Sequence, residues 1–210
     1  MRPVSIALTS AAFAVALALS GAGAASAQAA GATAAAAPPP VTAEDRVLGR
    51  ADAPVTVIEY ASFVCDHCAA WHNEVFPQFK ARFIDTGKVK LVFRNLPTEP
   101  ADAAFAAAAV ARCAAPERYF DVASSFFAGQ SALFAGQGRK WFNDAVAVSG
   151  RTQAEIAACF DRPETQARLT ADVAGATAAG ARSTPTFFVN GRKAADQSLQ
   201  TLTAAIEAAQ

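Results

Sequence analysis

Two cysteines separated by two residues, Cys65 and Cys68, follow directly after the apolar run 55–60. This spacing serves half of a zinc site as readily as a reactive dithiol, so the spacing alone does not assign a function. A cysteine that follows a buried strand and precedes a helix lies at the positive pole of that helix, which favours thiolate over thiol. The position of Cys65 therefore indicates a redox-active dithiol rather than an inert bridge or a metal site.

The segment around the cysteines predicts a βαβ unit. Residues 55–60 are rich in β-branched side chains and apolar on both faces, as in a central parallel strand. Apolar residues at helical spacing predict a helix over 66–85, which Pro77 should kink and Gly87 should end. The run 89–93 then predicts the second parallel strand, which completes a right-handed unit.

The rest of the chain divides into a helical block and a second β region. Approximately residues 98–181 are alanine-rich and predict several helices. Strand character returns at 186–189, where Asn190 and Gly191 are typical of a hairpin turn into a short strand, and a helix is expected over about 198–209. The order βαβ, helices, ββα predicts an α/β thioredoxin fold with an inserted α-helical domain.

The N-terminal residues are predicted to be a signal peptide over 1–27. Arg2 precedes an apolar stretch that ends near Leu19, and small residues follow before Gln28. The apolar run is shorter than the ~20 residues that span a bilayer, which argues against a membrane anchor. We therefore expect export to the periplasm as a soluble protein, where disulfides persist.

Residues 28–43 are almost entirely alanine, glycine and proline, and are expected to form a flexible tether. Such a segment carries too little apolar surface to build a dimerisation domain, so a monomer is expected. The remaining residues, 44–210, have the size of one domain. Eighteen basic and eighteen acidic residues give a formal net charge of zero without basic clusters, which argues against a nucleic-acid partner.

Three separated segments resemble the DsbA-like thiol:disulfide oxidoreductases of the thioredoxin superfamily. These segments are residues 57–68, residues 83–89 with 93–97, and residues 184–187 with 190–191, and the resemblance covers essentially all of the predicted domain. It implies that Cys65 attacks or holds the substrate disulfide, that Cys68 resolves the mixed disulfide, and that a cis peptide bond at Pro185 faces the dithiol. The family motif often reads Cys-Pro-His-Cys, so Asp66 is a departure that bears on oxidising strength.

Disulfide exchange needs a thiolate, so the surroundings of Cys65 should lower its pKa. The helix N-terminus favours the thiolate, and His67 lies close enough for its imidazole or its backbone amide to reach the Cys65 sulfur. Asp66 carries a negative charge and should raise the pKa of Cys65. We therefore expect His67 and Asp66 to act on Cys65 in opposite directions.

Glu59 interrupts the first strand and is a candidate proton relay. Strand alternation points it beneath the dithiol, where a buried carboxylate should have a raised pKa and could exchange protons with Cys68. The family resemblance supports this role, because it implies an acid at this position; the alternative is a carboxylate satisfied by a local hydrogen bond.

His72 could join Cys65 and Cys68 to give three metal ligands. A solvated histidine on a helix face is favoured instead, and no metal or cofactor is expected.

Thr184 and Pro185 are candidate substrate-binding residues. A cis bond before Pro185 would leave the N–H and C=O of Thr184 free to pair with an extended substrate chain; the alternative is a trans proline that begins a strand.

Cys113 and Cys159 lie in different predicted helices, and the pair of cysteines that remains in an exported protein most simply forms a structural disulfide. The resemblance agrees, while a second redox couple that relays electrons to Cys65 remains an alternative.

The function predicted from these features is an exported oxidoreductase that introduces disulfides into proteins. Its expected partners are reduced exported polypeptides and a membrane quinone-linked reoxidant of the DsbB type, or another thiol redox partner. One alternative is an isomerase or reductase of the same fold, with which the threonine before Pro185 is compatible. A metal-binding module that uses Cys65, Cys68 and His72 is the alternative from another class.

Overall fold

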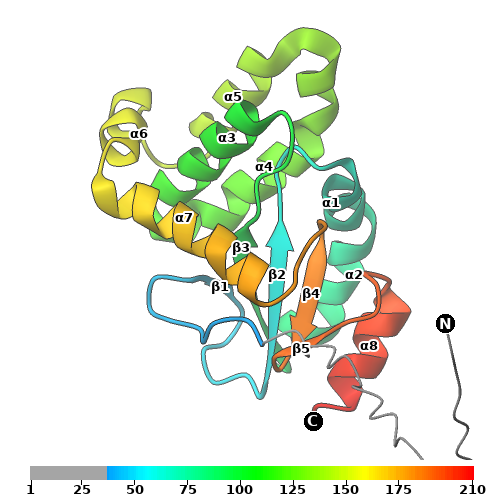
Figure 1. The fold of residues 1–210 in the computed structure, drawn as a ribbon. Helices are drawn as coiled ribbons and strands as arrows, with labels where there is room; N and C mark the ends of the chain where they lie inside the picture. The colour runs from blue at the N-terminus through cyan, green and yellow to red at the C-terminus, as the bar shows by residue number, and fades with distance from the viewer. Residues whose placement is uncertain (1–36) are drawn as a thin grey trace, which may run out of the picture. The chain divides into compact units, whose positions relative to one another are not determined.

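The computed structural model describes residues 37–210, which form a five-stranded mixed sheet with helices around it (Figure 1). The strand order is β1-β3-β2-β4-β5, with β2 parallel to β3, and with β1 and β4 antiparallel to their neighbours. The bounds are β1 Arg46–Leu48, β2 Val55–Ala61, β3 Val89–Asn95, β4 Thr186–Val189 and β5 Arg192–Lys193. The predicted α/β order of βαβ, helices and ββα is confirmed.

The helix predicted over 66–85 is a continuous helical run in which α and π turns alternate. It comprises α1 Asp66–Ala70, the π turn Trp71–Val75, α2 Phe76–Phe79 and the π turn Lys80–Ile84. Pro77 lies in the first turn of α2, and the amide of Phe76 donates to the carbonyl of Trp71, five residues earlier. Insertion of a π turn is one way that a helix accommodates a proline, which has no amide to donate.

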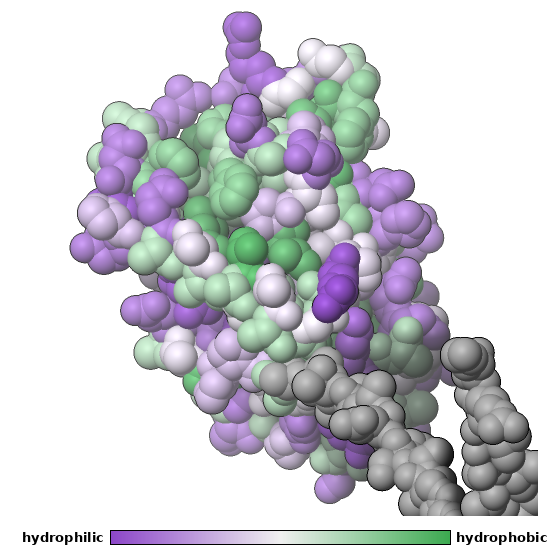
Figure 2. Space-filling view, in the orientation of Figure 1, coloured by the Kyte–Doolittle hydropathy of each residue, from purple (hydrophilic) through white to green (hydrophobic). Residues whose placement is uncertain are grey.

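Five α-helices lie between β3 and β4 in the chain, and together they form the helical insertion. They are α3 Ala101–Cys113, α4 Tyr119–Ala132, α5 Gly138–Ala147, α6 Gln153–Phe160 and α7 Pro163–Ala178. Helices α3 to α6 gather beyond one end of the sheet, while α7 runs back along it (Figure 1). In the space-filling view, apolar residues are prominent among the side chains of this helical region (Figure 2).

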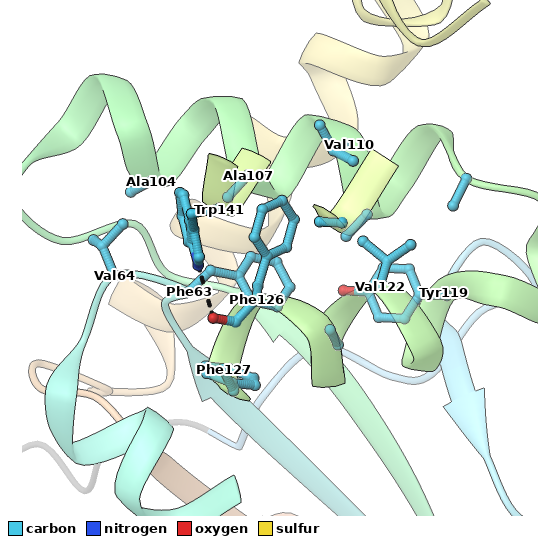
Figure 3. Packing of buried hydrophobic residues seen from close by; sticks show 14 of the residues in the cluster. Phe63, Val64, Ala104, Ala107, Val110, Tyr119, Val122, Phe126, Phe127 and Trp141 are labelled. Carbon is cyan, nitrogen blue, oxygen red and sulfur yellow. Dashed lines mark hydrogen bonds between the residues drawn. The ribbon is translucent and has the colours of Figure 1, made fainter. Parts of the chain in front are cut away.

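Aromatic side chains join the insertion to the sheet. Phe63 stacks on Phe93 of β3, with 5.2 Å between ring centroids, and contacts Phe126 and Phe127 of α4. The indole of Trp141 donates to the carbonyl of Phe126 at 2.8 Å (Figure 3). All of these side chains are buried. The loop that carries the dithiol therefore begins at a rigid, close-packed core.

The N-terminal edge of the described chain differs from the sequence-based expectation. Strand β1, which was not predicted, pairs antiparallel with β3. The buried guanidinium of Arg94 donates to the carbonyls of Pro39 and Pro40 and pairs with Asp45. Pro39 and Pro40 are thus hydrogen-bonded to the domain through their carbonyl groups. The tether predicted over 28–43 stays a prediction. The remainder of the predicted tether and the predicted signal peptide 1–27 lie outside the described residues.

The C-terminal ββα part follows its predicted signals. Asn190 and Gly191 have φ values of 44° and 81°, the left-handed pair that a tight hairpin turn needs. Helix α8 spans Leu199–Glu207 and is capped by the Ser198 side chain, which accepts from the Thr201 amide. Among residues 37–210, no helix combines the length and the apolar character needed to cross a membrane.

Candidate active site

Cys65 and Cys68 lie where β2 gives way to α1, and their exposure differs. Cys65 is the N-cap of α1, and its Sγ accepts a hydrogen bond from the Cys68 amide at 3.4 Å. Cys65 is partly exposed, whereas Cys68 is fully buried, and both are free thiols in this structure. An incoming sulfur therefore has access to Cys65 alone.

The two thiols have pKa values that depart from the ordinary value in opposite directions. A hydrogen bond from the Cys68 thiol, aided by Thr184 and the Cys68 amide, lowers the pKa of Cys65 to about 6, against the effects of burial and of Asp66. Burial, together with the hydrogen bond and charge of Cys65, raises the pKa of Cys68 far above its usual range. At neutral pH the reduced site thus holds a thiolate at Cys65 and a thiol at Cys68.

The hydrogen bonds of His67 go to Asp66. Its amide donates to Asp66 Oδ1 at 2.8 Å, and its Nδ1 lies 3.0 Å from the same oxygen. Both side chains are exposed, and among the described residues no hydrogen bond joins His67 to the Cys65 sulfur. The adjacent carboxylate engages both donors, and a ring nitrogen of His67 lies within 4.8 Å of the Cys65 sulfur. The predicted effect of His67 on the Cys65 thiolate stays a prediction. The predicted unfavourable effect of Asp66 on the Cys65 thiolate is present.

Glu59 and His72 form a buried pair. Glu59 lies on β2 with no exposed surface, and His72 Nε2 is 2.9 and 3.1 Å from its two carboxylate oxygens. The imidazole stacks on Phe127 with 4.0 Å between ring centroids. The favoured prediction of a solvated His72 was wrong: this helix face packs against α4, and a buried carboxylate needs a polar partner. The charge of Glu59 also raises the pKa of Cys68.

The alternative metal-ligand set of Cys65, Cys68 and His72 is not assembled in the described residues. His72 faces Glu59 instead of joining Cys65 and Cys68. In the part of the chain that the structure describes, the group of possible metal ligands is Cys65, Asp66 and His67, whose ligand atoms lie within 4.8 Å of one another. Asp66 and His67 are exposed and already paired with each other, so this group does not favour a metal-binding module.

The Thr184–Pro185 segment faces the dithiol from the other side. Its peptide bond is cis, and the carbonyl oxygen of Thr184 lies 3.4 Å from Cys65 Sγ. Pro185 is buried, while Thr184 is partly exposed. A substrate chain that reaches Cys65 would therefore also reach the backbone of Thr184.

Gln130 belongs to the site, although nothing in the sequence indicated it. From α4, its Nε2 donates to the carbonyls of Phe63 and Cys65, both at 2.9 Å. Its side chain is buried, so these two bonds replace contacts with water. A glutamine in a helix rich in alanine and phenylalanine carries no signal of this role, because the partner carbonyls lie more than sixty residues away in the chain.

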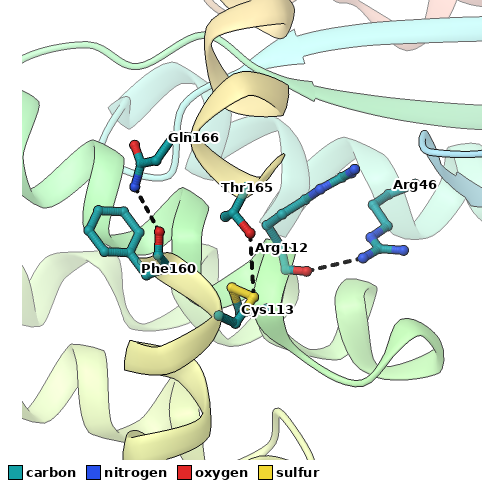
Figure 4. The surroundings of a disulfide bond; sticks show 7 residues. Arg46, Arg112, Cys113, Phe160, Thr165 and Gln166 are labelled. Carbon is teal, nitrogen blue, oxygen red and sulfur yellow. Dashed lines mark hydrogen bonds between the residues drawn. A yellow bond between two sulfur atoms is a disulfide. The ribbon is translucent and has the colours of Figure 1, made fainter. Parts of the chain in front are cut away.

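Cys113 and Cys159 form a disulfide within the helical insertion (Figure 4). The bond joins the last residue of α3 to α6, with 5.8 Å between the two Cα atoms. The sulfur of Cys159 lies 3.6 Å from Thr165 Oγ1. This pair is therefore built into the packing of three helices, α3, α6 and α7.

Comparisons with known proteins agree with this arrangement. A protein-family model described as Thioredoxin matches residues 41–208. A Rickettsia bellii protein named "Putative protein-disulfide oxidoreductase" is 30% identical over 172 residues, and a similarly named Rickettsia conorii protein is 31% identical over 172 residues. Each match covers 80% of this chain, but the chain spans only 66% and 61% of these relatives.

Two crystal structures share the fold. The α-DsbA1 protein of Wolbachia pipientis matches with a TM-score of 0.70 and 27% identity, covering 80% of this chain and 92% of that protein. BdbD of Bacillus subtilis also has a TM-score of 0.70, at 22% identity, covering 83% of this chain and 97% of that one. The predicted thioredoxin fold with a helical insertion is thereby confirmed.

Proposed function

Because the chain belongs to the DsbA-like thiol:disulfide oxidoreductases of the thioredoxin superfamily, we propose that it introduces disulfides into exported proteins through Cys65 and Cys68. One observation carries this proposal: the partly exposed Cys65 has a pKa lowered to about 6, whereas the buried Cys68 has a raised pKa. A stable Cys65 thiolate favours the reduced form of the enzyme, so the active-site disulfide readily accepts electrons.

The reaction starts from the oxidised Cys65–Cys68 pair. A client thiolate attacks the exposed Cys65 sulfur, the Cys65–Cys68 bond breaks, and Cys68 leaves with the electron pair and takes up a proton. A second client thiolate then attacks the client sulfur of the mixed disulfide, which forms the client disulfide and releases the Cys65 thiolate. Two electrons pass to the enzyme, and the low pKa of Cys65 makes it the better leaving group in this last step.

Glu59 is proposed to exchange the proton that Cys68 needs. The support is its complete burial on β2, its charge effect on Cys68, and its bridge to His72. A carboxylate shared with an imidazole can give or take a proton without leaving an unpaired charge in the core. His72 thus serves as a positioning residue, which holds the Glu59 carboxylate in place and offers it a hydrogen-bond partner in the core.

Client chains are proposed to bind along Thr184 and beside His67. A cavity of about 400 Å³ adjoins His67 and is lined by Trp71, Glu74 and Gln197, among others. The Thr184 carbonyl, close to the Cys65 sulfur, offers a backbone acceptor for an extended client segment. A client cysteine could thus reach Cys65 while its neighbouring residues occupy this cavity.

Export, partners and oligomeric state are proposed on the sequence alone. The features of residues 1–27 support cleavage and release into the periplasm, and the composition of residues 28–43, which could not build a dimerisation domain, supports a monomer. A quinone-linked membrane protein of the DsbB type, or another thiol redox partner, would restore the disulfide. The alternative direction, isomerase or reductase, is supported by Asp66, because its charge raises the pKa of Cys65.

Trapping of mixed disulfides tests the roles of the two cysteines. Cys68→Ala should accumulate mixed disulfides with client proteins, since the neighbouring Cys68 thiol can no longer attack the Cys65 sulfur and release a bound client, whereas Cys65→Ala should accumulate few. Equal trapping by both variants would contradict the assignment.

The glutathione equilibrium of the wild-type pair separates oxidase from reductase. We expect a potential between the ~−120 mV of DsbA and the ~−270 mV of thioredoxin. A thioredoxin-like value would favour the reductase direction.

A further inference from the structure

A cavity lined by arginines lies beside the Cys113–Cys159 disulfide. Its volume is about 490 Å³, and Arg46, Arg112, Arg151 and Arg162 line it together with both half-cystines. We call it the arginine pocket. Figure 4 shows Arg46 and Arg112 near Cys113. The proposed redox reaction makes no use of these four cations.

Most of the positive charge in the arginine pocket is uncompensated. Arg151 pairs with Glu155 at 3.5 Å, and Glu155 is the acidic residue in the wall. Within the described chain, Arg46, Arg112 and Arg162 form no ion pair with a carboxylate. Three guanidinium groups therefore share one cavity without a matching anion.

The hydrogen bonds of two of these arginines leave their charge in place. Arg46 Nη2 donates to the carbonyl of Arg112 at 3.0 Å, and Arg112 Nη1 donates to the carbonyl of Glu44 at 2.6 Å. Carbonyl groups carry no net charge. The Nε of Arg46 is buried and has no hydrogen-bond partner among the described residues, and such a donor costs free energy until an acceptor reaches it.

Nearby carboxylates do not neutralise the arginine pocket. Glu44 and Glu164 line an adjoining cavity of about 370 Å³, which shares the three unpaired arginines. The carboxylate of Glu44 lies 3.9 Å from Arg168 instead, and that of Glu164 forms no ion pair in the described part of the chain. Burial and the nearby charge of Arg46 also lower the pKa of Arg112, as like charges held together should.

We propose that the arginine pocket binds a small multivalent oxyanion, either a di- or tricarboxylate or a phosphate. Guanidinium groups bind carboxylate and phosphate oxygens through paired hydrogen bonds, and the cavity has the size of a small-ligand site. The unpaired arginines come from β1, α3 and the link between α6 and α7. One anion would therefore hold together the same part of the insertion that the disulfide joins.

Binding is tested on the mature protein with its disulfides intact, using citrate and inorganic phosphate in separate titrations followed by calorimetry. Sodium chloride at matched ionic strength corrects for screening. We expect saturable binding of at least one anion, and an affinity at least tenfold weaker in Arg162→Gln. Arg162 is exposed, and no side-chain hydrogen bond from it occurs in the described structure, so this variant should fold.

Arg139→Gln is the matched control, because Arg139 is an exposed arginine of α5 outside the pocket. It should bind the anion like the unmodified protein, and a bound anion should raise the melting temperature of both proteins. Binding of citrate alone would identify a carboxylate ligand, and binding of phosphate alone a phosphate ligand. Absence of saturable binding, or equal weakening by Arg139→Gln and Arg162→Gln, would overturn the proposal.

Discussion

Lowering the pH should remove much of the stability that the reduced protein has relative to the oxidised one. In the folded reduced protein the pKa of Cys65 is about 6, against an ordinary value of 9.0. Between these values the unfolded chain holds a proton on this sulfur that the folded protein lacks. The free energy of unfolding of the reduced form therefore rises with pH above about 6 and falls as the pH drops through that value.

The size of the effect follows from the same two pKa values. Each pH unit between them is worth about 1.4 kcal/mol, so the reduced form should gain up to about 2 kcal/mol between pH ~5 and pH ~7.5. Cys65 is partly exposed, and solvent screening lowers this figure, so about 1 to 2 kcal/mol is expected. The oxidised protein has no thiol at this position and should lack this component.

Denaturant unfolding of both redox forms across this pH range measures the difference. Cys113 and Cys159 are replaced by serine in all samples, so that only the active-site pair changes its redox state. Cys65→Ser in the same background is the control, since it retains a hydroxyl that does not titrate here. A stability difference between the redox forms that does not change with pH would refute the assignment of a thiolate to Cys65.

Three further predictions concern residues around the dithiol and in the insertion. Glu59→Gln should slow the step in which Cys68 takes up or loses a proton more than it slows the first attack on Cys65. Stopped-flow kinetics across pH measures both steps, and unchanged rates would mean that Glu59 has only a structural role. Serine at both Cys113 and Cys159 should lower the free energy of unfolding by up to about 4 kcal/mol, since the bond closes a loop of 46 residues, yet it should spare exchange activity; lost activity at normal stability would support an electron relay. Gln130→Leu should cost about 1 to 3 kcal/mol, because it leaves the buried Phe63 carbonyl without its donor and removes one of the two donors to the Cys65 carbonyl, which keeps the Ala69 amide. Gln137→Leu, at an exposed position of the same insertion, should be nearly neutral in thermal melts.

The sequence predicted the parts of the fold that local patterns encode. The apolar strand at β2, the Asn190–Gly191 turn and the breaks between helices each rest on the chemistry of a few adjacent residues. Strand β1 escaped prediction because three residues carry little periodicity. Its pairing with β3 depends on contacts between distant segments, and so do the hydrogen bonds from Arg94 to the carbonyls of residues 39 and 40.

The candidate site shows the same division. The dithiol stands out in the sequence because two closely spaced cysteines follow an apolar strand, and the Thr184–Pro185 segment stands out through the family resemblance. The environment of His72 could not be read in this way, since its burial depends on the packing of α4 against its helix face. The hydrogen bonds of His67 to Asp66 were not predicted, because the sequence does not show which of two nearby acceptors, a carboxylate or a sulfur, takes its donors.

Gln130 links the inserted helices directly to the redox centre. One amide group joins α4 to the carbonyl of Cys65, the residue that begins the reactive helix. Any displacement of α4, by a bound client or by a substitution in its packing, must stretch or release this link. A substitution in the packing of α4 would therefore act on the start of α1 even where both cysteines are unchanged, through a residue that lies 65 positions further along the chain.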